Sequence, residues 1–359
     1  MDVHTRNELF GETRNPVHAG RTPGGSSGGD SAAVAAGMVM FGLGTDYGGS
    51  IRWPAHCTGL VALRPTAGLV PGTGILPTPD AQAELAAPNF LSFQAQLQTI
   101  APIARRVCDL WPILRVIAGP DEYDSKGAPT VLGDPSAVRL EDLDVAWCDG
   151  DGSYPVREDL VSAVERAAGH LAAAGARTQR RRPPGLETAE HIFASLRDAE
   201  GLPDHRRFVG DALDQVSAQL RATLENAVDV PLSIYRDLAA RRDALRARVL
   251  TFMRDCPILL MPVACVPAFE ADATDVSLGG SVIPRMNVVT CCRVISLLGL
   301  PAAVVPVGRS AEGLSIGVQV VGRPYADHEV LAVASAIEEA ELASRDDDAP
   351  ALASGGRLG

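Results

Sequence analysis

Residues 44–71 have the sequence GTDYGGSIRWPAHCTGLVALRPTAGLVP, which contains five glycines and three prolines. This composition excludes a long helix, because glycine is a weak helix former and proline interrupts the intrahelical hydrogen bonds. Loops whose backbone approaches a ligand closely have this character. Ser50 follows Gly48 and Gly49, which let the chain turn sharply and direct N–H groups inward. A GGS sequence by itself is more often a simple turn, so Ser50 is at this point only a candidate nucleophile.

A second stretch rich in glycine and serine lies upstream, GRTPGGSSGGDSAA at residues 20–33. Ser26 and Ser27 stand between glycine pairs, directly before a helix that we expect to begin near Asp30. The N-terminus of a helix offers unpaired N–H groups and the positive end of its dipole, so it can bind an anion or stabilise an oxyanion. The alternatives are a flexible loop and a phosphate cradle, although the GxxxxGK[ST] phosphate loop requires a lysine that this segment lacks.

Taken together, the two stretches resemble the amidase signature family, whose members hydrolyse carboxamide C–N bonds with a Ser-cisSer-Lys triad. Ser26 lies 24 residues before Ser50, and GGSSGG, GTDxGGSIR and RPTAGLVP occur in the order and spacing of that family. The resemblance continues through residues 101–124 and 299–331 and is weakest in 130–255. It implies an α/β amidase signature fold, with a mixed central β-sheet covered by helices on both faces.

The resemblance also assigns roles to individual residues. Ser50 corresponds to the nucleophile and Ser26 to the bridging serine that relays its proton, with a cis peptide bond between Gly25 and Ser26. The oxyanion hole is expected from the backbone N–H groups of Tyr47, Gly48, Gly49 and Ser50. The supporting positions are Gly25, Ser27, Asp46 and Arg52, and a buried contact between Asp46 and Arg52 is expected. No metal or cofactor is implied.

The third member of the triad is a lysine upstream of the bridging serine, and no lysine precedes Ser26 in this sequence. Of the 32 basic residues in the 359-residue chain, only Lys126 is a lysine, and we expect it to be solvated on a surface connection. Two explanations remain open. In the first, the sequence lacks an N-terminal segment with helices and at least one strand, and Met1 is an internal methionine. In the second, the product is a degenerate, inactive relative. We favour the first, because the other motif residues are intact.

The rest of the chain alternates between helical and strand patterns, which indicates an α/β protein. Helices are expected over 103–118, 156–175, 188–200, 207–227, 231–255 and 329–342, and strands over 142–148, 257–262, 302–307 and 315–322. We expect a single amidase domain over residues 1–342 and a disordered tail over 343–359. Residues 76–98 look like an insertion near the pocket rim, and Trp53 is equally consistent with an acyl pocket and with simple packing.

Composition limits the classes of partner. The net charge of −12 disfavours a nucleic-acid binder, no apolar run is long enough to span a membrane, and the seven cysteines form no CxxC pair. The expected partner is a small-molecule amide, with a homo-oligomer possible and a cytoplasmic location. The expected reaction is acyl transfer to Ser50 followed by hydrolysis. The alternatives are an inactive amidase-like binding protein and an amidotransferase A-type subunit.

Overall fold

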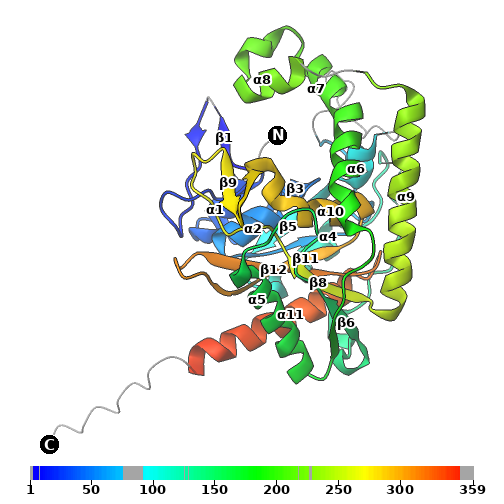
Figure 1. Cartoon of the computed structure of the whole chain (residues 1–359). Helices are drawn as coiled ribbons and strands as arrows, with labels where there is room; N and C mark the ends of the chain where they lie inside the picture. Colours follow the sequence, from blue (N-terminus) through cyan, green and yellow to red (C-terminus); the bar gives the residue numbers. More distant parts are fainter. Residues whose placement is uncertain are drawn as a thin grey trace, which may run out of the picture.

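The computed structural model describes residues 3–7, 9–75, 92–124, 126–127, 129–216, 218–225 and 229–347. Within them, one mixed sheet of eight strands forms the centre of the molecule (Figure 1). Its order is β3 (Phe41–Asp46), β5 (Thr99–Ala104), β4 (Val61–Arg64), β11 (Ala302–Arg309), β12 (Ser315–Val321), β8 (Ile258–Pro262), β6 (Asp144–Trp147) and β7 (Arg177–Arg180). Strand β6 runs parallel to β7 and β8, and the other pairs are antiparallel. The predicted mixed sheet is therefore confirmed.

Helices cover both faces of this sheet, as predicted. One face packs against α4 (Val107–Ile117), α5 (Glu158–Ala173) and α11 (Asp327–Asp347). The other face packs against α2 (Arg52–Thr58), α6 (Ala189–Leu196), α9 (Leu232–Asp255) and α10 (Thr290–Leu298). Strand β11 shows how the sequence produces the two layers, because Ala303 and Val305 enter the first cluster while Ala302 and Val304 enter the clusters on the other side. This alternation is the period of two that a strand imposes on its side chains.

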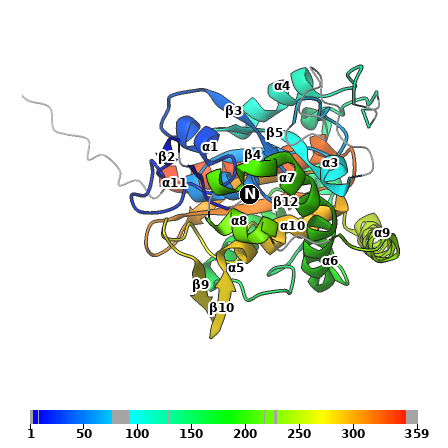
Figure 2. The same cartoon turned by 90° about the horizontal axis from the view of Figure 1, so that it is seen from above.

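Shorter elements complete the described chain. They are the hairpin of β1 (Arg6–Asn7) and β2 (Gly11–Glu12), α1 (Gly28–Ala35), α3 (Phe93–Leu97), α7 (Leu202–Val209), α8 (Ala218–Glu225) and the hairpin of β9 (Asp275–Leu278) and β10 (Ser281–Pro284). In the view from above, α7 and α8 lie in front of the central sheet (Figure 2). None of the helices in the described part of the chain is both long and apolar enough to cross a membrane.

Most helix and strand predictions are confirmed to within a few residues, and two boundaries are corrected. The helix expected over 103–118 begins only at Val107, because residues 99–104 pair with β3 and β4 as strand β5. The tail expected from residue 343 is helical as far as Asp347, where α11 ends, and residues 348–359 lie outside the described chain. Residues 76–91 of the expected insertion also lie outside it.

Candidate active site

Two loops that each precede a short helix meet at one end of the sheet. The Gly24–Ser27 loop precedes α1, and the loop that follows β3 runs from Tyr47 to Ile51 and precedes α2. The Ser27 N–H donates a 3.1 Å hydrogen bond to the carbonyl oxygen of Ser50, which joins the two loops. The peptide bond between Gly25 and Ser26 is cis, as the family resemblance predicted. The fold therefore brings together the two serines that the sequence had singled out.

The backbone around the cis bond is held by the N-terminal segment. The Thr5 hydroxyl donates to the carbonyl oxygen of Gly24 over 3.0 Å and accepts from the Gly28 N–H over 3.1 Å. A Cβ atom on Gly25 would lie 2.5 Å from the carbonyl oxygen of His4. Since real Cβ atoms do not approach other atoms so closely, only glycine fits at this position. The role expected for Gly25 is thus conformational.

Ser26 and Ser50 line a common pocket with a volume of about 200 Å³. Ser26 is exposed and Ser50 is half-buried. The pocket is lined by Val3, Gly25, Ser26, Thr45, Tyr47, Gly48, Gly49, Ser50, Gln94, Gln98, Phe193, Arg197, His205, Met286, Val289 and Arg293. The predicted catalytic and oxyanion-hole residues therefore share one concave surface, which is the usual setting of an active site.

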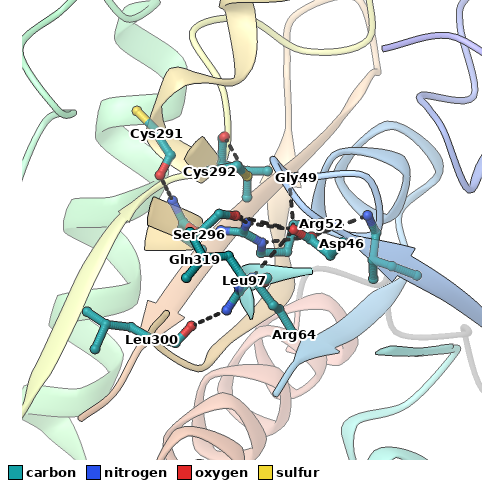
Figure 3. A network of polar contacts seen from close by, with 12 residues as sticks. Asp46, Gly49, Arg52, Arg64, Leu97, Cys291, Cys292, Ser296, Leu300 and Gln319 are labelled. Carbon is teal, nitrogen blue, oxygen red and sulfur yellow. Dashed lines mark hydrogen bonds and ion pairs between the residues drawn. The ribbon is translucent and has the colours of Figure 1, made fainter. Parts of the chain in front are cut away.

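A buried carboxylate organises the loop that carries Ser50. Asp46, at the end of β3, accepts hydrogen bonds from the Gly49 N–H (2.9 Å) and the Ile51 N–H (3.3 Å). It also forms a two-pronged ion pair with Arg52, with Nε–Oδ2 and Nη2–Oδ1 distances of 3.0 and 2.9 Å (Figure 3). Burial by itself would raise the pKa of Asp46, but Arg52, Arg64 and the loop N–H groups outweigh it and hold this pKa below its usual value. The predicted Asp46–Arg52 contact is confirmed.

The same network ties the loop to distant parts of the fold. Arg52 donates to Gln319 of β12 over 3.0 Å and to the hydroxyl of Ser296 of α10 over 2.6 Å. Gln319 in turn donates to the carbonyl oxygens of Pro262 and Cys291, each over 2.9 Å. Both side chains of the Asp46–Arg52 pair are fully buried. The position of Ser50 thus depends on contacts with residues more than 200 positions away in sequence.

One of the predicted oxyanion-hole donors is already engaged. The Gly49 N–H donates to Asp46, so this group supports the loop and is not directed at the pocket as the sequence analysis expected. Gly49 also has a φ of +111°, a conformation that favours glycine. A Cβ atom on Gly49 would lie 2.7 Å from Cβ of Cys292. The residue is therefore needed for its backbone conformation and for the absence of a side chain.

Replacing Gly49 by alanine is expected to reduce the free energy of unfolding by about 2 kcal/mol or more, because the φ is unfavourable for alanine and the new methyl group overlaps Cys292. Gly29→Ala is the matched control, since no atom lies within 4 Å of the added Cβ and its φ is not in the positive range. We expect the control to leave stability unchanged or raise it by up to about 1 kcal/mol. Urea unfolding of both variants compares them, and equal midpoints would contradict this role of Gly49.

Lys126 is not solvated, contrary to the sequence-based prediction. Its ammonium group donates to the carbonyl oxygen of Ala95 in α3 and lies 3.6 Å from a carboxylate oxygen of Asp124, and the side chain is only 12% exposed. Burial lowers the pKa of Lys126, against the opposing effect of Asp124. Lys126 does not line the pocket that contains Ser26 and Ser50. The only lysine of the chain therefore supports the α3 backbone.

The aromatic and thiol groups that follow the nucleophile loop are packing residues. Trp53 is fully buried between His56 and Phe269, with ring centroids 5.4 and 5.6 Å away, and its indole N–H donates to the carbonyl oxygen of Val3. It does not line the pocket, which decides between the two roles left open for it. His56 and Cys57 are also buried, and burial lowers the pKa of His56 to about 4.

Several pocket residues were not singled out by the sequence analysis. They come from α3, from α6 and the turn after it, from α7 and from the start of α10, and comprise Gln94, Gln98, Phe193, Arg197, His205 and Arg293. These residues lie in segments with no recognisable motif. Only the expectation that residues 76–98 approach the pocket rim gave a partial signal, and Gln94 and Gln98 agree with it.

Comparison with known proteins tests the family resemblance. The sequence model of one protein family, Amidase, matches residues 1–331. The chain belongs to the Amidase family. Members of the Amidase family are amide hydrolases, so the chain is an amidase by family, as the sequence analysis predicted.

Relatives within the Amidase family are named for different activities. The A subunit of the glutamyl-tRNA(Gln) amidotransferase of Synechococcus sp. is 30% identical over 95% of this chain and 71% of its own length. The human fatty-acid amide hydrolase 2 is 28% identical over 94% of this chain, which spans 64% of that protein. The solved structure of a 6-aminohexanoate cyclic dimer hydrolase complexed with substrate superposes with a TM-score of 0.79, 25% identity, and coverage of 94% of this chain and 72% of the hydrolase. The crystal structure of an amidase gives 0.77, 28%, 95% and 72%.

Proposed function

We propose that this protein hydrolyses carboxamide C–N bonds through an acyl-enzyme on Ser50, with Ser26 as the bridging serine. The observation that carries the proposal is the joint presence of both serines in one pocket, on two loops joined by the Ser27–Ser50 hydrogen bond. The buried Asp46–Arg52 pair supports it, because it fixes the loop before α2 without touching the Ser50 hydroxyl. Membership of the Amidase family supports the reaction type.

In the proposed reaction, the Ser50 hydroxyl oxygen attacks the amide carbonyl carbon while its proton passes to Ser26. The N–H groups of Tyr47, Gly48 and Ser50 stabilise the resulting oxyanion, since the Gly49 N–H is held by Asp46. Collapse of the tetrahedral intermediate breaks the C–N bond, and the proton carried by Ser26 goes to the leaving amine. Water then attacks the ester of Ser50, releasing the carboxylic acid and restoring the serine.

The base that removes the proton from Ser26 is a lysine in the family pattern, and no lysine is among the residues that line this pocket. Activity of this chain is therefore the feature that an experiment has to test. An inactive amidase-like binding protein is the alternative for a chain that folds but does not react. Three of the relatives compared, all about 30% identical, are named for the A component of glutamyl-tRNA(Gln) amidotransferase. These names favour an amidotransferase A-type subunit for the second candidate function.

A fluorophosphonate probe tests the proposed nucleophile. The folded protein is expected to add one probe molecule at Ser50, because an activated serine reacts with this phosphorus centre. Trypsin releases residues 22–52 as one peptide that contains Ser26, Ser27, Ser31 and Ser50, so fragment-ion sequencing is needed to locate the adduct. Urea-unfolded protein is the control and should not react. A folded sample that remains unlabelled, or that is labelled elsewhere, would favour the binding-protein alternative.

Glutamine separates the two enzyme candidates. An amidotransferase A-type subunit is expected to release ammonia from glutamine faster when its partner subunits are added. A free-standing amidase is expected to hydrolyse its amide at a rate that partner subunits do not change. The same ammonia assay serves both measurements, so the comparison needs only the two additions.

A further inference from the structure

The pocket has a positive lining in a negatively charged protein. The chain carries a net charge of −12, yet the lining includes two arginines and a histidine, Arg197, Arg293 and His205, and no aspartate or glutamate. A pocket whose charge opposes that of the whole protein needs a local reason. The arrangement of the two arginines supplies one.

Arg293 is fixed beside the nucleophile loop. Its side chain is 3% exposed, and Nη1 donates to Glu190 over 2.5 Å and to Asn287 over 3.3 Å, while Nη2 donates to the carbonyl oxygen of Met286. A Cβ atom on Gly48 would lie 3.5 Å from Cγ of Arg293, so this side chain packs directly against the predicted oxyanion hole. A guanidinium has five N–H donors, more than these three bonds use. A rigid guanidinium with remaining donor capacity is thus held at the pocket wall.

Arg197 contributes the second positive charge. It follows α6, is 26% exposed, and pairs with its neighbour Asp198 through a 2.7 Å contact that leaves Arg197 in the pocket lining. Burial lowers the pKa of Arg293, Glu190 opposes this effect, and the like charge of Arg197 lowers the pKa further. The two guanidinium groups are therefore close enough to repel one another in a poorly solvated site. An anion bound between them would relieve this repulsion.

Two amide side chains complete this wall. Gln94 and Gln98 lie one turn apart on and just after α3, and Nε2 of Gln94 donates to Oε1 of Gln98 over 3.2 Å. Their position is fixed by Glu200, which accepts from the N–H groups of Phe93 (2.8 Å) and Gln94 (2.5 Å). The wall opposite the glycine loop thus combines charged donors with amide groups, which suits a polar, anionic ligand better than a hydrocarbon chain.

We propose that the substrate is an amide that also carries a carboxylate, and that Arg293 and Arg197 bind this carboxylate while the carbonyl carbon of the amide faces Ser50. The planar guanidinium matches a carboxylate in geometry and charge. The inference rests on the proposed function, because it names the substrate class of the same pocket. Its test must therefore give an answer even for a protein that does not turn over.

Equilibrium binding to the Ser50→Ala protein provides that test. The probes are the monoamides of succinic, glutaric and adipic acid, each compared with the neutral amide of the same chain length, namely butanamide, pentanamide and hexanamide. At least one anionic probe is expected to bind about tenfold more tightly than its neutral partner, as measured by calorimetry at low ionic strength. Arg293→Gln and Arg197→Gln are each expected to remove most of this preference.

Arg241→Gln is the matched control, because Arg241 is an exposed arginine of α9 that lines a neighbouring groove but not this pocket. It should keep the preference. Arg197→Gln guards against misfolding of the more buried Arg293 variant, and thermal unfolding reports on both. Equal binding of anionic and neutral probes, no binding of either, or a preference that survives in both folded arginine variants would overturn the inference. Failure of fluorophosphonate labelling with the preference intact would instead count against the proposed function alone.

Discussion

Exchange of Ser50 for alanine is expected to reduce kcat/KM for amide hydrolysis by at least about 10³-fold, because it removes the atom that forms the acyl-enzyme. Ser26 cannot replace it in the proposed reaction, since Ser26 is exposed and lies on the other loop. Ammonia release from a primary amide measures the rate. Ser26→Ala is expected to slow the reaction by about 10²-fold or more, as is typical for loss of a proton-transfer group.

Ser335→Ala serves as the control for this pair of variants. Ser335 lies on α11, exposed, with a single hydrogen bond to Glu339, and is expected to leave the rate within about twofold of the wild type. Thermal unfolding should be similar for all three variants, which separates loss of chemistry from loss of structure. A Ser50→Ala protein that retains the wild-type rate would show that hydrolysis occurs at another site.

Exchange of Asp46 for asparagine is expected to lower the free energy of unfolding by about 3–5 kcal/mol, because it leaves buried Arg52 without its carboxylate. The amide group would also direct N–H donors at the guanidinium. The same change removes the acceptor that holds Gly49 and Ile51, so the loop with Ser50 should lose its reactivity toward fluorophosphonate. Urea unfolding and labelling rate measure the two consequences.

Asp142→Asn is the matched control, because this carboxylate is 71% exposed and lies 3.5 Å from Arg139 on the surface. An exposed ion pair contributes little, so the change should cost at most about 1 kcal/mol. An Asp46→Asn protein that unfolds at the same urea concentration as the Asp142 variant would show that the buried pair does not anchor the loop.

The pH dependence gives an independent measure of Asp46. Its pKa is lower in the folded than in the unfolded protein, so its contribution to stability is present above about pH 4 and is lost as the pH falls. Stability of the wild type should therefore decrease more steeply on acidification than that of Asp46→Asn. Parallel curves for the two proteins would mean that the pKa of Asp46 is not lowered by folding.

Local sequence was sufficient for much of the fold. The strands at 257–262, 302–307 and 315–322 and the helices at 156–175 and 231–255 were predicted because each has a clear apolar run or periodicity. Strands β3, β4 and β5 were missed, since they are short and interrupted by glycine or proline. They become strands by pairing with one another and with β11, which is a property of the assembled sheet.

The sequence by itself determined the family and the identity of the two serines, because motif residues such as Gly25 and Gly49 are required by backbone conformation and leave a local pattern. Only the tertiary structure decided that the Gly49 N–H is held by Asp46, that Lys126 is buried, and that Arg293 and Arg197 line the pocket. The physical reason is that these features are contacts between segments far apart in the chain. Hydrogen bonding and burial of a side chain depend on what packs against it, and no local periodicity contains that information.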